Sequence, residues 1–332
     1  MATTTTTRRR FVLGAPLFAS ARPPLAPALA QTAAAEWPSR PVRFILPYPP
    51  GGPTDIMGRV VAQALTRDLP QPVVVENRAG AAGAIGTEAV ARAAPDGTTF
   101  LVNASAHVIV PHMVRLPYDA LLDFAPVTNI ASVPLILVVT PGLPVRSVAE
   151  LIAHAKANPG KLSFASSSNG GAPHLAGELF KLMAGIDMAH VPYRGSGQAV
   201  PDLIAGNVQV MFDSMPSSAG AVREGRLRAL AVTTAGRQAA FPELPTVAEA
   251  GVPGYEIATW YGIWAPARTP PEIVARLHAA VAKAMRGEDA KEKMAALGAQ
   301  PVADAPEDFA RFVRAEYERW GRLVRDARIK AD

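Results

Sequence analysis

The first stretch that could bind a ligand is LPYPPGGPTDIMGR, residues 46–59. Its two adjacent glycines let the backbone approach a ligand closely, and Pro53 suits the first position of a helix. Thr54 and Asp55 can satisfy free amides of the first turn, and such amides favour a carboxylate or a phosphate. The Gly-Lys-Ser/Thr ending of a P-loop is absent. The pattern alone leaves two interpretations open, an ordinary capped turn and an anion-binding loop.

The second small-residue loop is RAGAAGAIG, residues 78–86. Its glycines, Gly80, Gly83 and Gly86, are spaced G-x-x-G-x-x-G, which differs from the G-x-G-x-x-G of dinucleotide-binding folds. No acidic residue stands about 20 positions further on at a strand tip. We therefore expect a second strand-to-helix turn beside the first one and no dinucleotide.

The third loop, ASSSNGGAPHL (165–175), repeats this arrangement of polar residues, glycines and a helix. Ser166, Ser168 and Asn169 can hydrogen-bond an anionic or polar ligand, and the alternative is a helix-capping loop. His174 falls in the first helical turn, where a buried structural histidine is favoured over a catalytic base.

The fourth loop is PYRGSGQAV, residues 192–200. Arg194 could clamp a carboxylate or remain a solvated surface residue, and Ser196 follows it. Asp213 ends the apolar run VQVMFD at the same predicted edge. It could cap the next turn or receive an amine or hydroxyl of a ligand.

Common enzyme signatures are absent from the sequence. There is no G-x-S-x-G, no H-E-x-x-H and no cysteine, and the six histidines show no metal-ligand spacing. We expect no cofactor and no metal. A serine that meets His174 and Asp213 through folding remains open as a hydrolase alternative.

The elements that must position these loops follow an alternating pattern. Residues 42–46, 73–77 and 98–103 are predicted strands, joined by helices that follow the first loop and span 83–94. This βαβαβ unit predicts parallel strands. The first helix is expected to bury one face, formed by Ile56, Val60, Val61, Ala64 and Leu65.

The remainder of the chain repeats this alternation. Predicted strands span 161–166, 188–193, 208–213, 227–233 and 255–266, and predicted helices span 147–157, 174–185, 199–206, 270–285 and 306–326. Within the strand 255–266, we expect core packing of Trp260, Tyr261 and Trp264.

These elements predict an α/β protein of two lobes connected by more than one crossing. VPLILVVT (133–140) and residues 229–234 are the expected crossings. The predicted division is a first lobe from 36–136, a second lobe from 137–232 and a return to the first lobe from 233–332. Such lobes form a cleft with a hinge, where ligands usually bind.

The charge distribution removes the main argument for nucleic-acid binding. The chain carries 33 Lys and Arg against 28 Asp and Glu, but residues 1–30 hold four arginines and no acid. The rest of the chain is therefore nearly neutral, and we expect no nucleic-acid partner.

Residues 1–30 have the features of a cleaved export signal. Residues 7–13, TRRRFVL, resemble the twin-arginine signal of bacteria, and APALA ends at Ala30 in a small-x-small pattern. A general secretory signal and an unstructured tail are the alternatives. We expect a periplasmic protein exported by the twin-arginine route.

Several longer stretches occur together along the chain: PVRFILPYPPGGPTDIMGRVVA, VVVENRAGAAGAIGTEAVARAAPDGTTFLV, LPYDALLDFAPVTNIASVPLILVV, LSFASSSNGGAPHLAGELF, VPYRGSGQAVPDLIAGNVQVMFDS, LRALAVTT and FPELPTVAEAGVPGYEIATWYGIWAPARTPPEIV. In this combination the chain resembles the periplasmic solute receptors of tripartite tricarboxylate transporters, the Bug family. The resemblance implies a type II periplasmic binding-protein fold, with a mixed sheet flanked by helices in each lobe. It also implies a monomer that closes around a small organic carboxylate and delivers it to membrane transporter subunits.

The resemblance also implies which residues bind the ligand. The first two loops would hold a carboxylate through backbone amides and ordered waters, at Tyr48, Pro49, Gly52, Thr54, Asp55, Ala81, Ala82 and Gly83. The second lobe would tune ligand choice, at Ser166, Ser168, Asn169, His174, Arg194, Ser196 and Asp213. Ser105 joins the expected site, although NASAHVIVPHM (103–113) departs from the family pattern.

The sequence leaves three candidate functions. The first is a carboxylate receptor without chemistry, and the second is an exported serine hydrolase that uses His174. The third, a transcriptional effector domain, is disfavoured by the export signal and by the lack of a preceding helix-turn-helix. Dicarboxylates, tricarboxylates, acidic amino acids and aromatic carboxylates all suit the same pincer, so the sequence leaves the ligand open.

Overall fold

The computed structural model describes residues 1–5, 37–296, 298–326 and 329. Apart from its first five residues, the predicted export signal lies outside this range. None of the helices in the described part of the chain is long and apolar enough to cross a membrane.

Strands and helices alternate along the chain. The strands are β1 (Val42–Leu46), β2 (Val73–Asn77), β3 (Thr99–Ala104), β4 (Phe124–Val139), β5 (Ser163–Ser166), β6 (Ala189–Pro192), β7 (Val210–Ser214), β8 (Arg228–Val232), β9 (Ala258–Pro266) and β10 (Gln300–Pro301). The helices are α2 (Pro53–Asp68), α3 (Ala84–Ala91), α4 (Ala106–Ile109), α5 (Val148–Ala157), α6 (Ala172–Ala184), α7 (Ser196–Ala205), α8 (Met215–Arg223), α9 (Pro271–Arg286), α10 (Glu288–Ala296) and α11 (Pro306–Asp326). Two short 3₁₀ helices are η1 (Ala81–Gly83) and η2 (Val110–His112).

The first half of the sheet has the order β2-β1-β3-β9-β4. β1 pairs in parallel with β2 and β3, as the βαβαβ pattern predicts. β9 returns from the last third of the chain and pairs antiparallel with both β3 and β4. The sheet is therefore mixed, and the two sequence-distant segments meet side by side.

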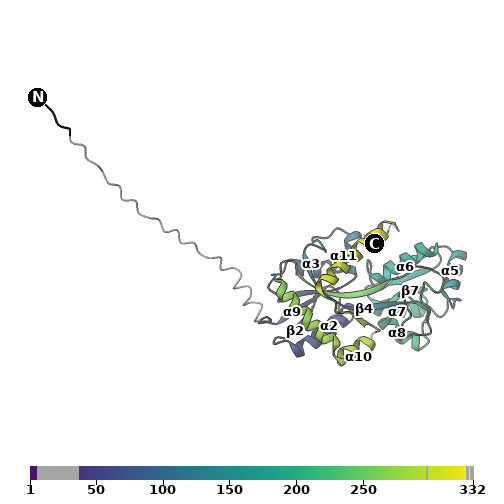
Figure 1. The fold of residues 1–332 in the computed structure, drawn as a ribbon. Helices are drawn as coiled ribbons and strands as arrows, with labels where there is room; N and C mark the ends of the chain where they lie inside the picture. The colour runs from purple at the N-terminus through teal and green to yellow at the C-terminus, as the bar shows by residue number, and fades with distance from the viewer. Residues whose placement is uncertain (6–36, 297, 327–328, 330–332) are drawn as a thin grey trace.

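The second half of the sheet is joined to the first through β4. β9 pairs with β4 as far as Pro134, and β7 pairs with β4 from Leu135 onward. β5 and β6 extend this half in parallel, and β8 also pairs with β4. Figure 1 shows the long arrow of β4 running between the two halves. This gives the two-lobed α/β fold predicted from the sequence, while the exact lobe boundaries remain a prediction.

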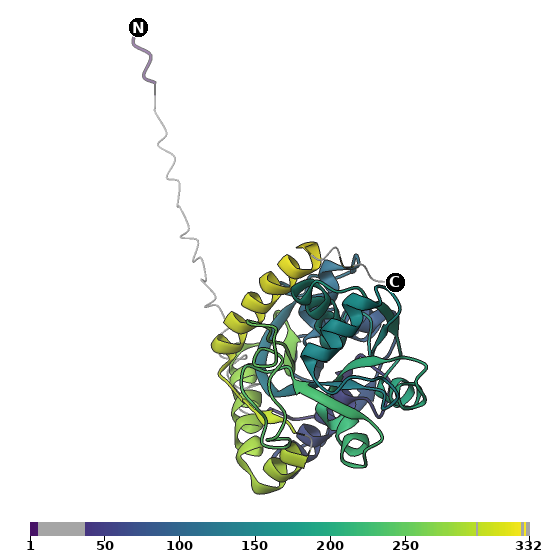
Figure 2. The same cartoon turned by 90° about the vertical axis from the view of Figure 1, so that its right-hand side faces the viewer.

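The helices cover both faces of the sheet in three packed groups. On one face, α3, α5, α6 and α11 share a core that extends under both halves. On the other face, α2, α9 and α10 cover the first half, and α7 and α8 cover the second. Figure 2 shows α11, in yellow, along one side of the molecule. Alternate residues of β4 point to opposite cores, since Leu135 and Leu137 belong to the first group and Ile136 to the last.

The buried face of α2 differs from the expected one. Met57, Val61 and Leu65 are buried at its centre, whereas Ile56 is 36% exposed. The prediction for Ile56 is wrong because the helix is turned toward the core by about one position. This rotation leaves Ile56 at the surface that faces the second half of the sheet.

Two strand boundaries also differ from expectation. β4 begins at Phe124, well before the apolar stretch 133–140 expected as a crossing, because its residues from Phe124 to Pro134 pair with β9. β9 begins at Ala258 and not at 255, because Ile257 donates its amide to Thr233 instead of joining the ladder.

Candidate functional site

A cavity of about 780 Å³ lies between loops of the two halves. The first half contributes the loop 48–54, parts of α2 and the ends of β3 and β9. The second half contributes the loops that precede α6, α7 and α8. The following residues of the sequence prediction line it: Tyr48, Pro49, Gly52, Thr54, Ser105, Ser168, Arg194 and Ser196.

The other predicted site residues lie outside the lining of this cavity. They are Asp55, Ala81, Ala82, Gly83, Ser166, Asn169, His174 and Asp213. Their assignment as ligand contacts remains a prediction. The contacts of several of them in the structure indicate a supporting role for the residues that do line the cavity.

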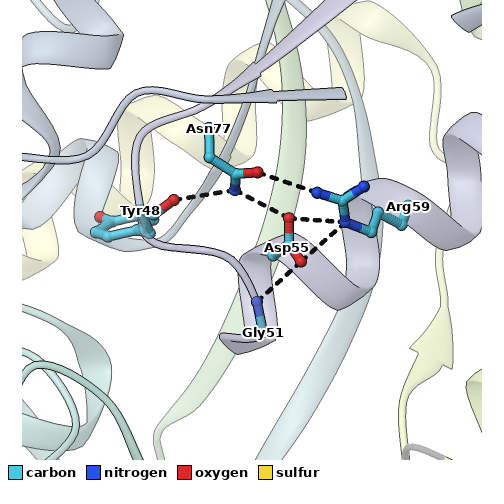
Figure 3. Close-up of polar contacts among 5 residues, drawn as sticks. All are labelled: Tyr48, Gly51, Asp55, Arg59 and Asn77. Atoms are coloured by element: carbon cyan, nitrogen blue, oxygen red, sulfur yellow. Dashed lines mark hydrogen bonds and ion pairs between the residues drawn. The ribbon is translucent and has the colours of Figure 1, made fainter. Parts of the chain in front are cut away.

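Asp55 ties the first loop to its surroundings (Figure 3). Its carboxylate accepts the Gly51 amide at 3.0 Å, both bonds from Arg59 Nε at 2.9 and 3.0 Å, and Asn77 Nδ2 at 2.9 Å. Asn77 Nδ2 also donates to the Tyr48 carbonyl at 3.0 Å. Both ends of the glycine-rich loop are therefore fixed by one buried carboxylate and its amide partner.

The charge of Asp55 is stabilised in place. Burial raises the pKa of this carboxyl, but hydrogen bonds from Arg59, Gly51 and Asn77 outweigh it and hold the pKa below its usual value. Helix α2 has Gly52 as its N-cap without a side-chain cap, and Pro53 has no amide. The first turn of α2 thus begins at the cavity, and the Asp55 side chain does not cap it.

The second loop packs behind the first one. Gly83 has φ of 93°, and a Cβ built there would lie 3.2 Å from the Tyr48 hydroxyl. A Cβ at Gly86 would lie 2.6 Å from the Arg78 carbonyl oxygen and 2.9 Å from Pro47 Cα. These close approaches explain the spaced glycines as a packing requirement of two adjacent loops.

His174 is buried and hydrogen-bonded, as the structural interpretation predicts. Its Nδ1 accepts the Gly170 amide at 3.2 Å, and its ring stacks on His190 with centroids 3.8 Å apart. Burial, with the neighbouring His190 and Lys181, lowers the pKa of His174 to about 3. The ring is therefore neutral at physiological pH and supports the loop that precedes α6.

The hydrolase arrangement is not assembled in this structure. Ser166 is fully buried and hydrogen-bonds His190 Nε2 at 2.7 Å, while Asp213 is bound by Ser196 and Ser218. His174 directs Nδ1 at a backbone amide. No group of three or more potential metal-ligating side chains occurs within the described ranges.

Several lining residues escaped the sequence prediction. Thr259 and Tyr261 of β9 both line the cavity, and Tyr261, for which the sequence favours core packing over ligand stacking, is buried in the core as well. Period-two alternation could have indicated them, because they share one face of the strand while Trp260 points to the core of α11. Ile56, Ser214 and Ser217 line the cavity as well.

The sequence matches one known protein family over most of its length. The sequence model of the family described as "Tripartite tricarboxylate transporter family receptor" matches residues 57–329. The chain belongs to this receptor family. The receptor is also 41% identical over 304 residues to the protein BugT of Bordetella pertussis, covering 91% of this chain and 93% of the relative.

Solved structures agree with the family. The receptor superposes on R. palustris Rpa4515 with adipate at a TM-score of 0.84 and 40% identity, over 89% of this chain and 99% of that one. It superposes on MatC from Rhodopseudomonas palustris with bound malate at 0.80 and 32% identity, over 87% and 100% of the chains. The resemblance stated from the sequence is thereby confirmed.

Gly52 lines the cavity with extended backbone angles that any residue adopts. A Cβ there meets only the Pro49 carbonyl at 3.7 Å, so Gly52→Val is expected to leave the fold intact. Its methyl groups fill the space beside the first turn of α2, and carboxylate affinity should fall at least about tenfold in calorimetry.

Gly142→Val is the matched control for Gly52→Val. Gly142 has no neighbour within 4 Å of a built Cβ and lies outside the cavity lining. Equal losses of affinity in both variants would show that valine acts through stability and not through the loop.

Proposed function

We propose that the receptor binds a small organic carboxylate between its two halves and delivers it to the membrane subunits of a tripartite tricarboxylate transporter. Binding involves no chemical conversion of the solute. The proposal rests on one observation above all, the charge pattern of the cavity.

Of the described residues that line the cavity, Arg194 alone carries a charge. The remaining lining consists of small polar and apolar residues, with no acidic side chain among them. A single guanidinium in such a site favours an anion and repels cations, and a guanidinium matches the planar geometry of a carboxylate.

The first loop supports the same ligand class from the opposite side. Gly52 and Thr54 line the cavity where α2 begins, and the positive end of the helix dipole lies there. Because the Asp55 carboxylate is bonded to Arg59, it does not cap the first turn of α2. The backbone amides of that turn therefore remain available to a ligand. A carboxylate can therefore meet a helix N-terminus on one side and Arg194 on the other.

The apolar part of the lining limits the size and nature of the solute. Ile56, Met57 and Val133 lie beside the polar groups. Such a lining accommodates a carbon skeleton between the polar ends. The adipate and malate named with the two R. palustris structures are small acids of this kind.

The family and the predicted export signal support a proposal for location and partners. We place the receptor in the periplasm, exported by the twin-arginine route and acting there as a monomer. Lobe closure around the solute would create the surface that the membrane subunits recognise.

The test of the proposal is isothermal titration calorimetry with adipate and its uncharged diamide. We expect the purified receptor to bind the acid and not the diamide, and Arg194→Gln to weaken acid binding about tenfold through loss of charged hydrogen bonds. Arg226→Gln, which removes a surface arginine paired with Glu224 outside the cavity, is the matched control.

A panel of other mono-, di- and tricarboxylates follows if adipate does not bind. The proposal fails if no carboxylate binds, or if diamides bind as tightly as acids. It also fails if Arg194→Gln and Arg226→Gln have the same affinity for every acid that binds.

A further inference from the structure

Asp213 is a fully buried carboxylate directly behind the cavity wall. It lies at the end of β7, has no exposed surface and is absent from the cavity lining. Ser196 Oγ donates to one of its oxygens at 2.6 Å, and Ser218 Oγ donates to the other at 2.6 Å. One carboxylate thus joins α7, α8 and β7 beneath the ligand site.

The bond to Asp213 determines what Ser196 can offer to a ligand. A serine hydroxyl has a single hydrogen, and an ionised carboxylate can only accept hydrogen bonds. Burial raises the pKa of Asp213 to about 6, so the carboxyl is ionised at pH 8. The Ser196 hydrogen is therefore committed to Asp213, and only the lone pairs of Ser196 Oγ remain.

Ser196 itself is at the cavity, where it begins α7 with 7% of its surface exposed. The wall formed by the first half offers hydroxyl groups in a different state. Ser105 and Thr259 also line the cavity, and their buried hydroxyls have no hydrogen-bond partner within the described residues. Their hydrogens are free to be donated to a ligand oxygen. Ser196 therefore offers an acceptor to the cavity, whereas Ser105 and Thr259 across from it offer donors.

We propose that Asp213 fixes Ser196 as a hydrogen-bond acceptor and that the receptor consequently selects acids carrying a hydroxyl or amino group at this wall. The inference rests on the proposed function and deepens it by naming a subclass of carboxylates. Asp213 acts as a positioning residue, because it reaches the ligand only through Ser196.

The same arrangement disfavours a carboxylate oxygen in direct contact with Ser196 Oγ, as distinct from one bound by the neighbouring Arg194. A carboxylate oxygen would face the lone pairs of Ser196, with the buried negative charge of Asp213 directly behind them. Adipate carries no donor on its carbon chain. It should therefore bind this receptor less tightly than its 2-hydroxy derivative does.

The experiment compares matched acids by calorimetry at pH 8. Succinate, malate and 2-methoxysuccinate form one set, and adipate, 2-hydroxyadipate and 2-methoxyadipate form the other. The methoxy acids keep the oxygen but lack its hydrogen. In at least one set we expect the hydroxy acid to bind about tenfold tighter than both partners, as one buried hydrogen bond predicts.

Three variants assign the preference to the Ser196 and Asp213 pair. Ser196→Ala removes the acceptor and should reduce the hydroxy-to-methoxy ratio to less than about threefold. Asp213→Asn can donate an amide hydrogen to Ser196 Oγ and release the hydroxyl hydrogen, so this ratio should fall below one. Ser218→Ala keeps the bond between Ser196 and Asp213 and should retain the wild-type ratio.

The ratio of affinities is the readout, because loss of a buried negative charge raises the affinity for every anion alike. If Asp213→Asn does not fold, Ser196→Ala alone decides. The inference is overturned if deoxy or methoxy acids bind the wild-type receptor as tightly as hydroxy acids in both sets. It is equally overturned if the preference persists in Ser196→Ala. Binding of no acid at all would instead overturn the proposed function.

Discussion

Replacing Asp55 by alanine is expected to weaken carboxylate binding at least about tenfold and to lower the free energy of unfolding by about 2 kcal/mol. The carboxylate is 5% exposed and accepts hydrogen bonds from Gly51, Arg59 and Asn77. Without it, these part-buried hydrogen bonds are lost, and each contributes about 0.5–1.5 kcal/mol. The loop also loses the bond from the Gly51 amide, and Asn77, which donates to the Tyr48 carbonyl, loses its carboxylate partner.

Two controls separate loop shape from general stability in this prediction. Asp55→Asn keeps the size of the side chain but loses its charge, and we expect an intermediate loss of affinity. Asp68→Ala removes an acid from the other end of α2, where it pairs with Lys283 far from the cavity. Calorimetry and urea unfolding measure both quantities. An Asp55→Ala variant with wild-type affinity would contradict the assigned role.

Acidification from pH 7 to pH 4.5 is expected to destabilise the receptor by about 4 kcal/mol through two buried histidines. Burial lowers the pKa of His107 to about 4, and burial with the neighbouring His190 and Lys181 lowers that of His174 to about 3. An unfolded histidine binds its proton near pH 6.5. Below that pH the unfolded chain holds more protons, so the free energy of unfolding falls as pH falls, by about 2 kcal/mol per histidine at pH 4.5.

One carboxyl group opposes this loss in the same pH range. Because burial raises the pKa of Asp213 to about 6, the folded state takes up this proton first, which adds stability between pH 6 and about 4. Urea unfolding at pH 7 and 4.5 measures the balance. His107→Asn should reduce the difference between the two pH values by about 2 kcal/mol, whereas His154→Asn on the part-exposed face of α5 should leave it unchanged. Equal differences in all three proteins would contradict the assignment.

The sequence predicts the α/β order well where local patterns agree with the final packing. The strand 73–77 and the helix 306–326 match the structure in both bounds. The apolar stretch 133–140, expected as a crossing, belongs to a strand that begins already at Phe124. Its first part contains Thr128 and Asn129, which are satisfied by Asp304 from the end of the chain, and no local pattern can indicate such a distant partner.

The site is predictable to the level of loops and less so to the level of side chains. Glycines and serines at strand ends indicated the loops that form the cavity, and Arg194 and Ser196 do line it. Asp55 and Asp213 carry the same local signal but turn away, since Arg59 and Ser218 bind them. Side-chain direction depends on these tertiary partners, which spacing alone does not reveal.

The position of β9 between β3 and β4 affects how this protein can fold during its synthesis on the ribosome. β3 ends at Ala104 and β9 begins at Ala258, yet Leu101 pairs with Trp264. The strands of the second half are already complete at Val232. During synthesis the second half can therefore assemble first. Until β9 emerges, the edge of β3 that later pairs with it stays unpaired and can associate with incorrect strands. β9, which emerges after all the strands of the second half, then closes the half that was started first.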